Sequence, residues 1–241
     1  MDNPFKHIDV FILCGGLGER LKKLNLNVPK PMIKIGARPF LDMIIVYMAN
    51  FGFRRFILGL GYKADFIKKY YSDKPEEGWK IIFSHEKNPL GTGGAIKNAK
   101  KLIQSRCFFV LNGDSFCQFN PRDLLNFHRR KKALATILLK RSAGAAKDCG
   151  EVKINGLSRV ISFQEKNDNA KKCLINSGVY VFDKKIFNVM PRKNSFSLEY
   201  DLFPVIIGNG LFGCVSSGYF IDIGTPKRYF KAKKHFGKVS G

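Results

Sequence analysis

Residues 10–31, VFILCGGLGERLKKLNLNVPKP, decide the fold that we expect for the rest of the chain. The apolar run at residues 10–13 predicts a buried strand, and a glycine-rich loop follows it directly at residues 14–18. Glycines let main-chain N–H groups approach a ligand closely, and Arg20 and Lys30 add positive charge beside them. The segment therefore predicts a strand followed by a loop that suits a polyphosphate.

The spacing of these glycines differs from that of two well-known phosphate loops. A dinucleotide fingerprint needs a third glycine at position 21, where this chain has Leu21, and a P-loop needs a Gly-Lys-Ser/Thr sequence that this loop lacks. On these residues alone, a plain glycine-rich turn between a strand and a helix is an equal alternative. Residues elsewhere in the chain have to distinguish the two interpretations.

Strand-like and helix-like segments alternate through the first half of the chain. We expect strands at residues 8–13, 56–60, 79–84 and 107–112, and helices at residues 39–50, 63–71 and 93–103. Such a βα repeat predicts an α/β fold with a mostly parallel sheet.

The alternation ends after about residue 120. Further helices are expected at residues 121–130, 197–207 and 226–236, and strands at residues 133–139, 175–182, 212–215 and 219–221. Residues 150–154 and 158–163 flank Asn155-Gly156, which predicts a hairpin with a two-residue turn. The 241 residues suit one domain, 1–241, with parts of about 1–120 and 121–241.

The chain carries a large excess of basic residues, with 42 lysines and arginines against 19 aspartates and glutamates and a formal net charge of +23. Such a charge suits nucleic acid, an anionic membrane surface or anionic substrates. The basic residues form separated doublets along the whole chain, which is typical of solvated helix faces. We therefore expect no nucleic acid and no membrane as partners, and a basic nucleic-acid-binding protein is the alternative from another class.

Six cysteines are scattered singly, at positions 14, 107, 117, 149, 173 and 214. Core packing in a reducing compartment explains them better than a zinc site does. No uninterrupted apolar run reaches about 18 residues, so we expect a soluble cytoplasmic protein. The 22 phenylalanines suit a subunit interface as well as a core, which leaves a homo-oligomer open.

Two aspartates follow apolar segments at points where strands are expected to end. Asp114 comes after residues 107–111, and Asp222 comes after residues 219–221 and before a glycine turn. Open α/β sheets bind ligands at the carboxyl ends of their strands. A lone aspartate there is usually a turn or cap residue, but two carboxylates can share one Mg²⁺ ion, whose other ligands are water and phosphate oxygens. The pair therefore favours a metal site.

The loop at residues 86–94, EKNPLGTGG, is expected on the same edge of the sheet as Asp114. Its glycines permit close approach of a flat base, and Glu86 could accept hydrogen bonds from N1–H and N2–H₂ of guanine or from N3–H of uracil. A glycine pair that only begins a helix is the structural alternative.

Glu165 and Lys166 follow the second strand of the expected hairpin. In isolation they suit an ion pair on a surface turn. Beside a phosphate loop and a metal site, Lys166 could neutralise the phosphate of a second substrate, and Glu165 could accept hydrogen bonds from its hydroxyls.

Taken together, these segments resemble the motifs of sugar-1-phosphate nucleotidylyltransferases along essentially the whole chain. The matching motifs are, in order, LCGGLGERL at residues 13–21, PKP at 29–31, PLGTGGA at 89–95, NGD at 112–114, EK at 165–166, NSGVY at 176–180 and DIGTP at 222–226. Within this family the compact length and the LGTGG form are most similar to D-glycero-α-D-manno-heptose 1-phosphate guanylyltransferases. Mannose-1-phosphate guanylyltransferases and N-acetylmuramate 1-phosphate uridylyltransferases are the rival resemblances.

The resemblance implies a Rossmann-like, three-layer α/β/α nucleotidyltransferase fold of the GT-A-like type, with an added β-hairpin sugar-binding part. It implies transfer of GMP from GTP to a sugar 1-phosphate with Mg²⁺ as cofactor. The implied catalytic residues are Arg20, Lys30, Asp114 and Asp222, with Asp114 and Asp222 as metal ligands. Nucleotide binding is implied for Leu13, Gly15, Gly16, Gly18, Arg20, Lys30, Glu86, Gly91 and Thr92, and sugar-phosphate binding for Gly150, Glu165, Lys166 and Asn176.

Overall fold

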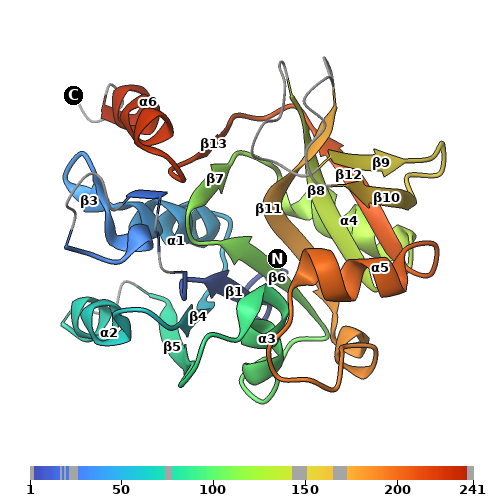
Figure 1. Cartoon of the computed structure of the whole chain (residues 1–241), viewed down its shortest axis with the longest axis horizontal. Coiled ribbons are helices and arrows are strands. Elements are labelled where there is room, and N and C mark those ends of the chain that lie inside the picture. The colour runs from blue at the N-terminus through green and yellow to red at the C-terminus, as the bar shows by residue number, and fades with distance from the viewer. Residues whose placement is uncertain are drawn as a thin grey trace.

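The computed structural model describes residues 3–16, 18, 20–21, 27–73, 78–142, 151–164 and 173–237. Within these residues a nine-stranded sheet crosses the molecule, with strands in the order β10-β9-β11-β6-β1-β4-β5 and with β8 between β11 and β12 (Figure 1). Its strands are β1 (Asp9–Leu13), β4 (Arg55–Leu60), β5 (Lys80–His85), β6 (Cys107–Asn112), β8 (Ala135–Arg141), β9 (Glu151–Ile154), β10 (Val160–Gln164), β11 (Leu174–Asp183) and β12 (Leu211–Ser216).

The first half of the chain forms the parallel part of this sheet. Strand β1 pairs in parallel with β4 and β6, and β4 pairs in parallel with β5. The side chains of β1 alternate between two apolar clusters, since Val10 and Ile12 pack in one and Phe11 in the other. A parallel strand covered on both faces needs this uninterrupted apolar run, which explains the composition of residues 10–13.

Helices cover both faces of the sheet and make the outer two layers. On the side of Val10 lie α1 (Phe40–Asn50), α2 (Ala64–Ser72), α4 (Pro121–Arg130) and α6 (Pro226–Gly237). On the side of Phe11 lie α3 (Gly91–Asn98), the short helices η3 (Lys184–Asn188) and η4 (Leu198–Leu202), and α5 (Phe203–Ile206). The α/β fold with a layered, mostly parallel sheet is thus confirmed.

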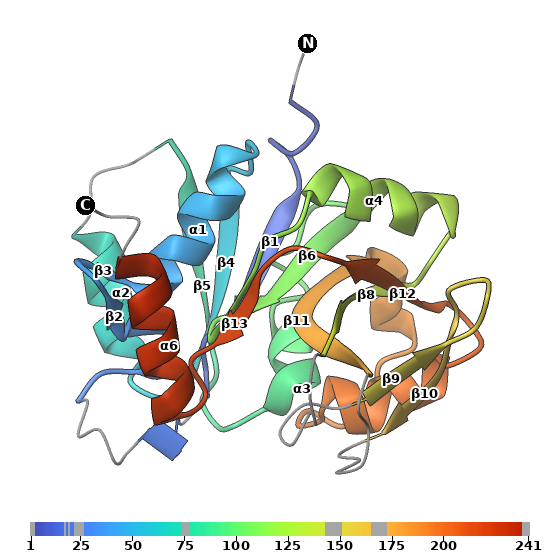
Figure 2. The same ribbon diagram turned by 90° about the horizontal axis from the view of Figure 1, so that it is seen from above.

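The second half of the chain adds antiparallel pairing. Strand β11 is antiparallel to both β6 and β8, and β9 and β10 form the expected hairpin. Figure 2 shows this hairpin at one end of the molecule and α6 at the other, beside the small β2 (Lys34–Ile35) and β3 (Arg38–Pro39) ribbon. The chain reaches α6 through the short strand β13 (Phe220–Asp222). The buried residues of α6 belong to the same apolar cluster as those of β1 and β4, so the C-terminal helix packs with the first half of the chain.

The predicted two-residue turn of the hairpin is wrong. The connection runs from Asn155 to Arg159, and Ser158 adopts a left-handed φ of 64° in place of a glycine. The Asn155 side chain stabilises this longer loop, because its Oδ1 accepts hydrogen bonds from the N–H groups of Leu157 and Arg159 at 3.0 Å. Side-chain bonding to the local backbone replaces the tight turn that Asn155-Gly156 favours.

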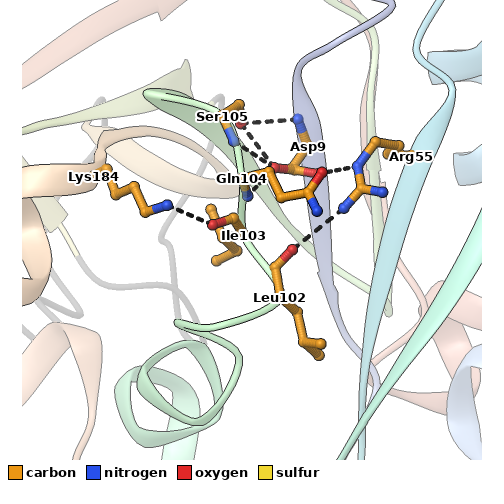
Figure 3. A network of polar contacts seen from close by, with 7 residues as sticks. All are labelled: Asp9, Arg55, Leu102, Ile103, Gln104, Ser105 and Lys184. Atoms are coloured by element: carbon orange, nitrogen blue, oxygen red, sulfur yellow. Dashed lines mark hydrogen bonds and ion pairs between the residues drawn. The ribbon is translucent and has the colours of Figure 1, made fainter.

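A buried ionic network fixes the beginning of β1 (Figure 3). Asp9 is fully buried, and its carboxylate accepts hydrogen bonds from Arg55 Nε at 2.8 Å and from the N–H groups of Gln104 and Ser105 at 2.6 and 2.8 Å. A buried carboxylate with this many donors is compensated for its lost hydration. The network joins β1, β4 and the segment before β6 at the edge of the sheet opposite to the glycine loop.

Among the described residues, no helix combines the length and apolarity needed to cross a membrane.

Candidate active site

The glycine loop begins where β1 ends and is held by both neighbouring strands. Cys14 donates its N–H to the carbonyl oxygen of Gly59 at 2.9 Å, and Gly113 donates to the carbonyl oxygen of Leu13 at 2.9 Å. The loop therefore leaves the sheet at a fixed point between the ends of β4 and β6. At Gly18 the backbone reaches a φ of 63°, which glycine adopts without strain.

A cavity of about 580 Å³, called here the first cavity, opens over this edge of the sheet. The predicted nucleotide-binding residues at its walls are Leu13, Gly15, Gly16, Lys30, Glu86, Gly91 and Thr92, joined by Asn112 and Asp114. Its other walls are largely apolar and include Tyr62, Pro89 and Leu90. A mostly apolar cavity with a few placed polar groups is the usual form of a small-molecule site.

Glu86 lies directly beside Gly15 in the wall of the first cavity. Its Oε2 accepts a hydrogen bond from the N–H of Leu90 at 3.2 Å, and a methyl group on Gly15 would lie 3.0 Å from its Oε1. Partial burial raises the pKa of the Glu86 carboxyl, although the hydrogen bond from Leu90 opposes this. Glu86 is therefore an acceptor held inside the cavity, and Gly15 leaves room for it.

The first turn of α3 is tied to the second half of the chain. The N–H groups of Gly93 and Gly94 donate to the carbonyl oxygen of Phe196 at 3.0 and 3.2 Å. Thr92 Oγ1 accepts a hydrogen bond from the N–H of Leu198 at 2.8 Å and donates to Glu199 Oε2 at 3.1 Å. Thr92 thus lines the first cavity while its hydroxyl serves as a structural link.

Asp114 and Asp222 meet through a short antiparallel ladder between β7 (Ser115–Cys117) and β13. In this ladder Asp222 pairs with Ser115, and Ile223 donates its N–H to the carbonyl oxygen of Asp114 at 2.9 Å. Each carboxylate has a cationic partner, since Lys30 Nζ pairs with Asp114 and Arg228 Nη1 lies 3.1 Å from Asp222 Oδ2. The two aspartates predicted from separate motifs are therefore neighbours.

A second cavity of about 290 Å³ contains both aspartates and shares Lys30, Asn112 and Asp114 with the first. Of the predicted residues, Arg20, Lys30, Asp114, Asn176 and Asp222 line it. The sequence reasoning missed Asn112, Ser177, Glu199, Tyr200 and Arg228, which also line it. Arg228 is the second residue after the DIGTP motif, and that position was the available signal for it.

Asn176 lies where the pairing of β11 with β8 is interrupted. Its Oδ1 accepts a hydrogen bond from the N–H of Gly178 at 2.9 Å, and its Nδ2 donates to the hydroxyl of Tyr180 at 2.7 Å. The Tyr180 hydroxyl also donates to Glu199 Oε1 at 3.4 Å. Glu199 consequently connects Thr92 in the wall of the first cavity with the Asn176 region of the second.

Three predicted sugar-phosphate residues, Gly150, Glu165 and Lys166, lie outside the described residues.

The donor set of the two aspartates fits a hard divalent cation. Asp114 and Asp222 offer two carboxylates, and no group of three or more histidine, cysteine, aspartate or glutamate side chains with a metal-binding arrangement occurs in the described ranges. Mg²⁺ needs only one or two protein carboxylates when phosphate oxygens and water complete its shell. The arrangement is unsuited to structural zinc, which requires four ligands that all come from the protein.

Residues 9–238 match the family model described as nucleotidyl transferase. The chain belongs to the nucleotidyl transferase family. This membership confirms the predicted family and the prediction of an enzyme, and it agrees with the position of the glycine loop over the carboxyl ends of the parallel strands.

Two curated relatives each match more than nine tenths of this chain. The chain is 40% identical over 223 residues to D-glycero-alpha-D-manno-heptose 1-phosphate guanylyltransferase of Campylobacter jejuni subsp. jejuni, covering 92% of this chain and 97% of the relative. It is 33% identical over 227 residues to mannose-1-phosphate guanylyltransferase of Mycobacterium tuberculosis, covering 93% of this chain but 63% of the relative. The chain thus spans less than two thirds of that longer enzyme.

Among solved structures, the crystal structure of HddC from Yersinia pseudotuberculosis superposes with a TM-score of 0.83 at 38% identity, covering 95% of this chain and 99% of that chain. The same protein complexed with GMP-PN gives a TM-score of 0.82. These likenesses confirm the predicted nucleotidyltransferase fold.

Proposed function

We propose that the chain is a sugar-1-phosphate guanylyltransferase, which transfers GMP from GTP to D-glycero-α-D-manno-heptose 1-phosphate and releases pyrophosphate. The observation that carries this proposal is the pair of adjacent cavities with Lys30, Asn112 and Asp114 in common. A transfer between two substrates needs such a junction, because both must meet at one phosphorus atom. Mannose 1-phosphate is the alternative acceptor, since both kinds of enzyme occur among the relatives.

The first cavity is proposed to hold GTP. Its described walls come only from residues 13–114, which supports the assignment of about residues 1–120 to the nucleotide. Glu86 would accept hydrogen bonds from N1–H and N2–H₂ of guanine, and the loop from Gly15 to Gly18 would follow the triphosphate. A uracil base, which has an N3–H donor, is the alternative for Glu86.

The second cavity is proposed to hold the sugar 1-phosphate. Most of its walls come from the second half of the chain, including Asn176, Glu199 and Asp222. We also assign Gly150, Glu165 and Lys166 to this substrate, on the resemblance of their motifs alone. Lys166 would then neutralise the phosphate of the acceptor.

The reaction needs no general base from the protein. The second pKa of a phosphate monoester is about 6, so the acceptor phosphate is largely dianionic at neutral pH. One of its oxygens forms a bond to the α-phosphorus of GTP while the bond to the departing pyrophosphate breaks. Arg20 and Lys30 would orient the two polyanions and stabilise charge on the pyrophosphate.

Asp114 and Asp222 are proposed to hold Mg²⁺, which when bound would neutralise negative charge on the phosphate oxygens. Lys30 and Arg228, which pair with these aspartates in the structure, keep the carboxylates compensated before that ion binds.

The test is an assay of pyrophosphate release over a matrix of four nucleoside triphosphates and a panel of sugar 1-phosphates. We expect GTP with the heptose phosphate to give the highest kcat/KM. A higher kcat/KM with mannose 1-phosphate would show that this sugar phosphate is the acceptor. If no pair of substrates releases pyrophosphate, the proposed activity is refuted.

The strong positive charge favours one alternative from another class, a nucleic-acid-binding protein. This alternative predicts association with DNA or RNA that falls steeply as salt rises. We expect weak retention of nucleic acid in a filter-binding experiment at physiological salt. Tight binding that excludes GTP would favour the alternative.

A further inference from the structure

Arg228 lies close to both carboxylate oxygens of Asp222, one of the two aspartates of the proposed metal site. Its Nη1 lies 3.1 Å from Oδ2 and 3.2 Å from Oδ1 of Asp222. Asp222 Oδ1 also accepts a hydrogen bond from the N–H of Gly224 at 2.8 Å. The Asp222 side chain is 18% exposed, so the ion pair is partly shielded from water and is stronger than a surface pair.

Lys30 forms an ion pair with one oxygen of the other aspartate, Asp114. Its ammonium group pairs with Asp114 Oδ2, and the Lys30 side chain is only 11% exposed. Each carboxylate of the proposed metal site is therefore compensated by a cation that belongs to the chain. Two neighbouring carboxylates repel each other, and nearby cations offset this repulsion. Among the described residues, Lys30 and Arg228 are the cations that pair with these two carboxylates.

Both Arg228 and Asp222 line the second cavity, which we propose as the acceptor site. Arg228 lies in the first turn of α6, directly after the segment that carries Asp222. A guanidinium group presents paired N–H donors that match a phosphate as well as they match a carboxylate. When a divalent cation binds Asp222, the same guanidinium is within the cavity where the acceptor phosphate would lie.

We propose that Arg228 is a phosphate-binding residue of the acceptor site, held on Asp222 in the metal-free protein and transferred to the phosphate of the sugar 1-phosphate once a divalent cation takes Asp222. The inference rests on the proposed function. Arg228 then competes with the cation for Asp222, so metal affinity is low without the acceptor. Binding of the acceptor phosphate removes this competition, and the two ligands bind cooperatively.

The experiment compares Arg228→Met with Lys227→Met. Lys227 is exposed on the same helix, so the control removes the same charge one residue away. Mn²⁺ binding to the protein without nucleotide is measured by electron paramagnetic resonance of the free ion. We expect Arg228→Met to bind Mn²⁺ about fivefold more tightly than the wild type, because a competing charge is gone, and Lys227→Met to be unchanged.

The second measurement is steady-state kinetics at saturating Mg²⁺. We expect Arg228→Met to raise the KM for the sugar 1-phosphate about tenfold or more while the KM for GTP changes by less than about twofold. Arg228→Lys keeps the charge but loses the fork, so we expect near-wild-type Mn²⁺ affinity with a raised KM for the acceptor. This variant also tests the inference if Arg228→Met fails to fold.

Weaker Mn²⁺ binding in Arg228→Met, or an unchanged KM for the acceptor in both arginine variants, would overturn the inference. Either result leaves the proposed function intact if the wild type releases pyrophosphate. Failure of the wild type to release pyrophosphate from any substrate pair refutes the proposed function, whereas the Mn²⁺ titration still reports whether Arg228 competes for Asp222.

Discussion

Ile223 donates its main-chain N–H to the carbonyl oxygen of Asp114 across 2.9 Å, and this bond joins two acidic segments that lie far apart in the sequence. The ladder between β7 and β13 continues from it and brings Asp222 opposite Ser115. The relative position of the two carboxylates is therefore set by main-chain hydrogen bonds. Side-chain variants at Asp114 and Asp222 are expected to alter chemistry with little change in the fold.

Asp114→Ala and Asp222→Ala should each lower divalent-dependent pyrophosphate release by about a thousandfold or more, because a metal ligand supplies several kcal/mol of charge stabilisation. The rate is measured against Mg²⁺ concentration, with Asp123→Ala, an exposed aspartate on α4, as the control. Near-normal turnover in either variant would remove that residue from the metal site.

Glu86→Gln should reduce the preference for GTP over the other triphosphates by about tenfold or more, since an amide replaces one acceptor oxygen by a donor that meets N1–H or N2–H₂ of guanine. The measurement is the ratio of kcat/KM for GTP to that for UTP. An unchanged ratio would show that Glu86 does not read the base.

Thr92→Val should lower the free energy of unfolding by about 1–3 kcal/mol, because it leaves the N–H of Leu198 and one oxygen of Glu199 without the hydroxyl partner. The KM values for both substrates should rise, since Thr92 lines the first cavity and Glu199 the second. Urea unfolding and steady-state kinetics measure the two effects. Thr92→Ser keeps the hydroxyl and should behave like the wild type; equal losses in both variants would contradict the role of the bond.

Acid should destabilise the protein partly through His128. Burial lowers the pKa of this imidazole from 6.5 to about 4, and its Nδ1 lies 2.9 Å from Thr136 Oγ1. The folded state therefore favours neutral His128. Between pH 6.5 and about pH 4 the unfolded chain binds more protons at this residue than the folded protein does, so the free energy of unfolding decreases as the pH falls. The loss between pH 7 and pH 4 is expected to reach about 3 kcal/mol.

The check for His128 is urea unfolding of the wild type and His128→Gln at pH 7 and pH 4. The variant should lose about 3 kcal/mol less than the wild type over this interval, since the other histidines are common to both. An equal loss in both proteins would show that His128 does not contribute.

Local sequence patterns predict most of the residues that the structure brings together in the first cavity, the proposed nucleotide half of the site. Gly15 and Gly16 follow the apolar run of β1, and Glu86 follows β5, so these residues lie at the carboxyl ends of parallel strands, which meet at one edge of the sheet. Element type and order follow from the same patterns.

The second cavity, the proposed acceptor half, is less predictable because it depends on pairing between distant short segments. Strands β7 and β13 have three residues each, too few for a periodic signal, yet they bring Asp222 beside Asp114. Glu199 lines the second cavity from the short helix η4 and Arg228 from the first turn of α6, and only the packed fold determines the direction of these elements. The turn at Asn155 was predicted wrongly since its side chain bonds to the next residues and lengthens the loop.

The described walls of the first cavity lie within residues 13–114, whereas the second cavity takes most of its walls from residues 163–228. On the proposed assignment, GTP and the sugar 1-phosphate are bound mainly by different parts of the sequence, and gene recombination can separate these parts. A crossover near residue 120 between relatives would carry the donor preference with one parent and most of the acceptor preference with the other. On the proposed assignment, new sugar nucleotides would arise in this way from existing halves, provided that Asp114 and Asp222 remain neighbours.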